Sequence, residues 1–206
     1  LEALPEELVR VQPRLVLFHV WALVFTGQLE AVEAQLQEAE KAEERDISGE
    51  ITAIRATVAY FRRDLPLAIA LYGQAFEQAP EENLFLRGAV ALSLATAYNL
   101  HGDIAGAKWA FAQASAISEA NNNIYVAVMA LCNLARLHSE QGQLHQAAEQ
   151  YHRALALAEQ QVEQGGTHLP ITGRVYVGLG EISYQRNELD AAINYLQEGL
   201  KLGQQN

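Results

Sequence analysis

The chain has 206 residues, of which 25 are acidic and 14 basic, and its formal net charge is −11. Half of the residues are hydrophobic, which is ample for a core, and the few glycines and prolines favour helices over sheets. Because the chain is acidic and has no block of basic residues, it would repel a phosphate backbone, and we expect no direct nucleic-acid binding.

The cysteine content and the lack of long apolar runs bear on the compartment. Cys132 is the only cysteine, so no disulfide can form within the chain, which fits a reducing compartment. No apolar run reaches the roughly 20 residues that span a bilayer, and the N-terminus has no signal-peptide pattern. We therefore expect a cytoplasmic protein without membrane association. Because the chain starts at Leu1 rather than at a methionine, we interpret it as a fragment of a longer multidomain protein.

An internal repeat organises the chain. Its clearest copy runs from Leu134 to Ala158 and predicts two helices folded back on each other across a glycine. Five copies align, with turn residues at Gly27, Arg63, Gly102, Gly142 and Asn187. Glycine and asparagine suit the left-handed backbone conformation that ends a helix. Arg63 is the exception, so we expect either local strain or a different turn there.

Three positions after each turn repeat a small–large–small pattern. Five residues past the turn the side chain is small or branched, nine past it is bulkier, and twelve past it is small again. The three sets are Val32, Ala68, Ala107, Ala147 and Ala192; Leu36, Tyr72, Phe111, Tyr151 and Leu196; and Ala39, Ala75, Ala114, Ala154 and Gly199. These offsets share one helical face. A single helix pair cannot bury both of its faces, so the pairs must stack on one another.

We predict ten main helices in five antiparallel pairs. In chain order the pairs are 13–25 with 28–44, 48–62 with 65–79, 84–100 with 104–120, 123–140 with 144–163, and 170–185 with 189–203. Residues 1–12 are predicted to form a short capping helix. Pro80, the polar run 121–123 and the segment 165–170 are predicted breaks. The expected fold is all-α, a superhelical solenoid with a period near 40 that forms a single domain over residues 1–206.

One short motif invites a phosphate-binding interpretation. Val177–Gly180 looks like the start of a dinucleotide fingerprint, but Ser183 holds the place of the third glycine and no strand precedes the motif. We interpret these glycines as sites of close helix packing. No phosphate-binding G-x-x-x-x-G-K-[ST] loop occurs in the sequence.

Metal and nucleophile chemistry are weakly supported. His138, His145 and His152 are spaced by seven residues, but no H-E-x-x-H motif or cysteine pair accompanies them, so we expect no metal site. Cys132 lies in the apolar run MALCNLA, which is typical of a small buried side chain rather than of a nucleophile. We expect no catalytic residue, no cofactor and no enzymatic activity.

The remaining candidate site is the concave groove. In stacked helix pairs, the first helix of each pair lines the inside of the curve. Mapping the repeat places ten candidates there, namely Trp21, Thr57, Tyr60, Thr96, Asn99, Asn133, Arg136, Arg174, Glu181 and Tyr184. Aromatic, amide and arginine side chains on such a wall suit a peptide or a sugar-like polar ligand. An ordinary solvated face is the alternative interpretation.

Parts of this pattern resemble the tetratricopeptide repeat. Gly102–Asp103 is followed at the expected offsets by Ala107, Phe111 and Ala114, and the second copy ends its own set with Pro80. Leu179–Gly180 matches the Leu-Gly pair of that repeat's first helix. The usual period is about 34 residues. The longer spacing here predicts longer helices or links.

A closer resemblance covers essentially all 206 residues. The Gly-Gly…Leu-Pro link at 165–170 and the run Tyr184 to Ala192 resemble the helical repeat region of MalT-like, ATP-dependent LuxR-type bacterial transcription activators. In that family a nucleotide-switch ATPase precedes the repeats and a helix-turn-helix domain follows. The resemblance implies a sensor region that binds a small-molecule inducer or a regulatory protein and biases self-association. A generic tetratricopeptide scaffold for a partner protein is the alternative function.

Overall fold

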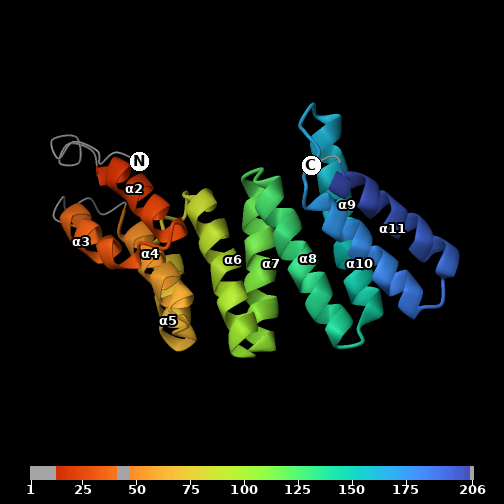
Figure 1. The fold of residues 1–206 in the computed structure, drawn as a ribbon, viewed down its shortest axis with the longest axis horizontal. Coiled ribbons are helices and arrows are strands. Elements are labelled where there is room, and N and C mark those ends of the chain that lie inside the picture. Colours follow the sequence, from red (N-terminus) through yellow and green to blue (C-terminus); the bar gives the residue numbers. More distant parts are fainter. Residues whose placement is uncertain (1–12, 41–46, 205–206) are drawn as a thin grey trace. The chain divides into compact units, whose positions relative to one another are not determined.

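The computed structural model describes residues 13–40 and 47–204, and these contain ten α-helices and no strand (Figure 1). The capping helix expected at residues 1–12 lies outside the described residues. Among the helices described, none combines the length and apolarity needed to cross a membrane.

The chain divides into two compact units, residues 1–102 and 103–206. Unit 1 contains α2 (Pro13–Phe25), α3 (Leu29–Glu40), α4 (Ser48–Phe61), α5 (Leu65–Gln78) and α6 (Leu84–His101). Unit 2 contains α7 (Ile104–Ala120), α8 (Ile124–Glu140), α9 (Leu144–Glu163), α10 (Thr172–Gln185) and α11 (Leu189–Gln204).

Antiparallel pairing is confirmed inside each unit. α2 packs on α3 and α4 on α5 in unit 1, while α8 packs on α9 and α10 on α11 in unit 2 (Figure 1). All ten predicted helices are present and begin within two residues of the predicted starts. The predicted end of the second helix falls in the segment 41–46, outside the described residues.

All five predicted turn residues have a left-handed backbone. Their φ angles are 77° at Gly27, 65° at Arg63, 90° at Gly102, 73° at Gly142 and 61° at Asn187. Arg63 therefore uses the same turn as the other copies, and it is a strained one for a residue with a Cβ atom.

The hydrogen bonds of the Arg63 turn are those of a regular helix end. The Asp64 N–H donates to the Ala59 carbonyl and the Arg63 N–H donates to the Tyr60 carbonyl, both at 3.0 Å. This pair of bonds satisfies carbonyls that the end of α4 would otherwise leave free.

Short polar side chains start the helices that follow. The side chains of Asp64, Asn83, Asp103 and Asn123 each accept a hydrogen bond from the backbone N–H three residues later. The bond from the Gly106 N–H to the Asp103 carboxylate is 2.9 Å long. Each cap satisfies a donor that the first turn of the helix leaves free, so the sequence marks where α5, α6, α7 and α8 begin.

The small–large–small pattern forms the core of both units, with one exception. Positions five, nine and twelve past the turns are buried in every copy except Leu196 on α11, which is 44% exposed. In unit 1 the buried residues of α2 and α3 form a hydrophobic cluster with Ile47, Ile51 and Ile54. In unit 2 one continuous cluster joins α8, α9 and α10.

Leu196 belongs to an apolar stripe along α11. Leu189, Ile193 and Leu200 complete the stripe, and all four side chains are about half exposed. The equivalent residues on α9 are Leu144, Ala148, Tyr151 and Leu155, which all pack in the unit 2 cluster that α10 helps to form. On α11 the equivalent face is left about half exposed in the described residues, and Leu196 packs against Gly180 of α10.

Candidate functional site

The candidate residues on α2 and α4 are largely tied to their own unit. The Trp21 ring stacks on Phe25 with centroids 5.6 Å apart, and its Nε1 donates to the Glu50 carboxylate at 3.3 Å. Thr57 is buried, and its hydroxyl donates to the Ala53 carbonyl at 2.8 Å.

The other unit 1 candidates are half-buried. Tyr60 lies edge-on against Phe61 with ring centroids 5.8 Å apart. The Thr96 hydroxyl donates to the Leu92 carbonyl at 2.9 Å. Asn99 lies one turn further along α6. The Thr57 and Thr96 hydroxyls are thus engaged with the backbone of their own helices.

The candidate residues of unit 2 leave more polar groups available. Asn133 donates its amide to the Met129 carbonyl at 2.9 Å, and Arg136 forms an ion pair with Glu140 one turn later on α8. Arg174, Glu181 and Tyr184 are exposed on α10, and their side chains form neither a hydrogen bond nor an ion pair in the part of the chain that the structure describes.

Three of these candidates influence the pKa of Tyr151, a residue that its place in the repeat assigns to the core. Burial raises the pKa of the Tyr151 phenol to about 12. The Glu181 carboxylate also raises this pKa, while the guanidinium groups of Arg174 and Arg136 lower it, so all three charged groups lie within electrostatic range of the hydroxyl. Arg136, Arg174 and Glu181 thus all influence the pKa of one buried side chain, and no hydrogen bond or ion pair links them to it in the described residues.

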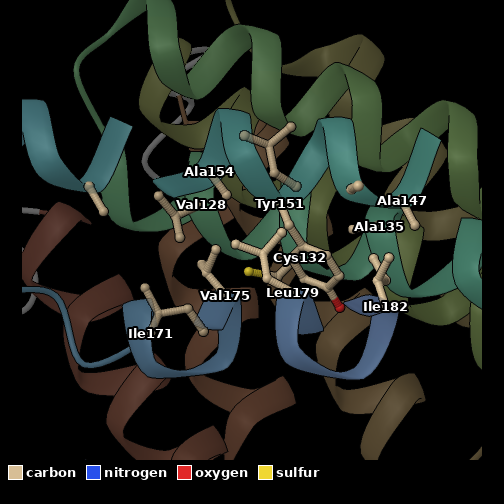
Figure 2. Close-up of a cluster of buried hydrophobic side chains, with 13 residues drawn as sticks. Val128, Cys132, Ala135, Ala147, Tyr151, Ala154, Ile171, Val175, Leu179 and Ile182 are labelled. Carbon is tan, nitrogen blue, oxygen red and sulfur yellow. The ribbon is translucent and has the colours of Figure 1, made fainter. Parts of the chain in front are cut away.

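A glycine on α10 makes room for the Tyr151 ring. A Cβ atom at Gly178 would lie 2.1 Å from the Tyr151 Cζ atom, which is far inside van der Waals contact. Figure 2 shows the ring lying across α10, with its hydroxyl oxygen beside Leu179 and Ile182. The predicted role of Val177–Gly180 in close packing is confirmed, since Gly180 likewise faces the Leu196 side chain at 2.8 Å from where a Cβ would lie.

Unit 1 contains the equivalent tyrosine in a closed environment. Tyr72, like Tyr151, lies nine residues past its turn. Its hydroxyl is 2.9 Å from the Thr57 hydroxyl, and this hydrogen bond lowers its pKa, although burial raises the pKa overall. Thr57 is the repeat equivalent of Arg136, and Ser93 is the equivalent of Gly178. The tyrosine hydroxyl at this repeat position is therefore hydrogen-bonded within unit 1, whereas in unit 2 it makes no hydrogen bond among the described residues.

The histidines and the cysteine are placed as follows. Cys132 is buried, and burial raises the pKa of its thiol to about 11, so its interpretation as a packing residue is confirmed. His145 and His152 are exposed. The His138 ring nitrogen Nδ1 lies 3.2 Å from the Lys108 ammonium, within a polar contact between α7 and α8. Among the described residues no group of three or more potential metal ligands gathers.

An apolar hollow of about 490 Å³ lies between α3, α4 and α5 in unit 1, lined by residues that include Leu29, Val32 and Val58. Arg55 borders it at a position where Leu94, Leu134 and Leu179 are buried in other copies. The Arg55 guanidinium instead forms ion pairs with Glu33 at 2.8 Å and Glu40 at 2.6 Å.

The paired helices, the left-handed turns and the buried small–large–small pattern define a tetratricopeptide-like helical repeat protein. The family model of the MalT-like tetratricopeptide region matches residues 49–206, and the chain belongs to this family. No protein of curated function matches the sequence.

Solved structures show the same fold at low sequence identity. BtubC of P. vanneervenii has a TM-score of 0.78 at 16% identity, over 96% of this chain and 84% of that one. The apo form of RapI has a TM-score of 0.76 at 14% identity, over 94% and 70%. A signal transduction ATPase with numerous domains from Pyrococcus horikoshii, which carries a tetratricopeptide repeat sensor, has a TM-score of 0.57 at 12% identity. The match covers 93% of this chain and 37% of that ATPase.

Proposed function

We propose that residues 1–206 form a single sensor domain of a cytoplasmic, ATP-dependent transcription regulator of LuxR type. The observation that carries the proposal is the match to the MalT-like repeat region over residues 49–206. It is supported by the likeness in fold to an ATPase whose repeats are described as a sensor. In this proposal the ATP-binding and DNA-binding steps belong to other domains of the parent protein.

The sensing surface in this proposal is the face of α8 and α10 around Tyr151. Arg136 comes from one helix pair and Arg174 and Glu181 from the next, so a ligand that contacts all three would bridge the pairs. Such a ligand favours the relative placement of α8 and α10 that it fits best, in proportion to its difference in affinity between two shapes. To move a 1:99 population to 99:1, that difference must be about 10⁴-fold.

The consequence for the regulator is a change in self-association. We expect the ligand-bound shape to expose or cover a surface through which the parent protein oligomerises. Small-angle scattering and light scattering of the parent protein, with and without its inducer, measure both quantities. Unchanged dimensions together with an unchanged oligomeric state at saturation would contradict this mechanism.

The gene context provides the first test of the function itself. The proposal requires a P-loop ATPase domain encoded upstream of residue 1 and a helix-turn-helix domain encoded downstream of residue 206 in the same reading frame. A reading frame that lacks both domains would remove the regulator function. The second candidate, a scaffold that binds a partner protein, would then be favoured, because the fold is shared with BtubC and RapI, neither of which is described as an ATPase.

A further inference from the structure

The hollow of unit 1 lies where one position of the repeat differs from the later copies. Eight residues before the turn, the last three copies have Leu94, Leu134 and Leu179, and each of these side chains is at most 8% exposed. Leu179 fills the contact with the preceding helix pair, because it belongs to the cluster that joins α8, α9 and α10. The second copy has Arg55 at this position instead.

The Arg55 side chain does not replace the missing leucine. Its guanidinium pairs with Glu33 at 2.8 Å and Glu40 at 2.6 Å, and the side chain is 29% exposed. The hollow of about 490 Å³ lies beside it, within the volume of about 300–1,000 Å³ that is usual for small-molecule sites. Its apolar walls come from α3, α4 and α5 and consist of Leu29, Val32, Val58, Ala59, Leu67 and Leu71.

Four charged side chains also line the hollow, and three of them already have partners. Arg55 and Glu33 form an ion pair, and the Asp64 carboxylate accepts a hydrogen bond from the Leu67 N–H at 3.2 Å. Arg62 is exposed, and its guanidinium forms no hydrogen bond or ion pair with any described residue. The unpaired charge beside the apolar walls is therefore positive.

We propose that this hollow binds a small carboxylic acid with an apolar body. The body lies between α3, α4 and α5, in the space that a leucine fills in the later copies, and binding removes its apolar surface from water. The carboxylate pairs with the Arg62 guanidinium, whose parallel N–H groups match its two oxygens. The site lies within unit 1, so it is separate from the α8–α10 face of the proposed function and does not depend on it.

The test uses the full chain with ¹³C-labelled methyl groups. The methyl groups of Val58 and Leu71 line the hollow and report on binding. Those of Leu137, which is 1% exposed at the position equivalent to Val58 in the fourth copy, are the control. The probes are hexanoate, hexanamide and acetate. Hexanamide keeps the apolar body without the charge, and acetate keeps the charge without the body.

We expect hexanoate to shift the Val58 and Leu71 signals saturably and acetate to leave them unchanged. Hexanamide should bind about tenfold more weakly than hexanoate, because a charged hydrogen bond is lost. Arg62→Gln should reduce the affinity for hexanoate to that for hexanamide. The matched control is Arg63→Gln, which changes the neighbouring arginine outside the hollow and should alter neither affinity. The Leu137 signals should not respond to any probe.

The variant Arg55→Leu tests whether the ligand occupies the space of the missing leucine. The new side chain should fill that space, so hexanamide binding should be lost, and a neutral probe excludes an effect of the removed charge. Circular dichroism at 222 nm and unchanged Leu137 signals confirm that the variant is folded.

Four results would overturn the site. They are no saturable shift from hexanoate, equal affinities for hexanoate and hexanamide, Leu137 shifts as large as those of Val58, and unchanged hexanamide binding in folded Arg55→Leu. None of them bears on the regulator function, which fails only if the parent reading frame lacks its ATPase and helix-turn-helix domains.

Discussion

The turn at Arg63 supplies a test of the repeat's backbone rule. Its φ is 65°, and the side chain is exposed and makes no hydrogen bond or ion pair within the part of the chain described. A left-handed backbone costs a residue with a Cβ atom about 1–2 kcal/mol. Glycine avoids this cost but loses about 0.5–1 kcal/mol more backbone entropy on folding. The net expectation for Arg63→Gly is a gain of about 0.5–1 kcal/mol in the free energy of unfolding.

Urea unfolding followed by circular dichroism at 222 nm measures this gain. In a chain of this size, about 1 kcal/mol raises the thermal midpoint by roughly 2–4 °C. The first control is Arg63→Ala, which removes the long side chain but keeps the Cβ atom and should bring no gain. The second is Asn187→Gly, which should gain less because asparagine tolerates the left-handed region better than arginine.

The pattern across these three variants decides the interpretation. An equal gain from Arg63→Ala and Arg63→Gly would assign the effect to the lost side chain and refute the backbone argument. A loss of stability in Arg63→Gly would mean that the turn is not strained in solution.

Three further predictions concern buried and paired groups. Tyr72→Phe should lower the free energy of unfolding by about 1 kcal/mol in urea titrations, because it removes the 2.9 Å bond to Thr57; an unchanged midpoint would contradict this. Arg55 holds the pKa of Glu33 below its ordinary value of 4.5, so the pair stabilises the fold above that pH and loses its effect as the pH falls through the depressed pKa. At pH 7 the free energy of unfolding of Arg55→Met should be lower than that of the wild-type chain by a few tenths to about 1 kcal/mol, as for other largely exposed ion pairs. This difference should become smaller by pH 3. A difference that does not change with pH would indicate lost packing instead. Cys132 should react with a thiol reagent at pH 8 only after urea unfolding, since burial raises its pKa; fast labelling of the folded chain would show that the thiol is accessible.

The fold was largely predictable because the repeat leaves its marks at fixed distances along the chain. Gly142 and the residues five, nine and twelve positions later specify a turn and a buried face without reference to any other copy. Even Arg63, which breaks the composition rule, keeps the left-handed turn. The hydrogen bonds and burial of the surrounding helices outweigh the preference of one residue.

The site was less predictable, because a candidate position does not reveal what a side chain already binds. Thr57 was placed in the groove by its position, but its hydroxyl contacts Ala53 and Tyr72. Tyr151 is buried, as its position predicts, yet charged groups on two helices influence its pKa. A glycine in the following copy could have signalled this, since Gly178 stands where unit 1 has Ser93. Whether the ten candidate residues bind a ligand stays a prediction.

The half-exposed stripe of α11 also predicts that local unfolding of the repeat array begins at this helix. Repeat arrays gain stability from each contact between neighbouring pairs, so a helix with one half-exposed face is stabilised by fewer such contacts. Backbone amides in α11 should exchange with deuterium faster than those in α9, whose equivalent face is covered. A molecule that binds the stripe formed by Leu189, Ile193, Leu196 and Leu200 would slow that exchange. The exchange rate of the α11 amides therefore measures binding to this stripe directly.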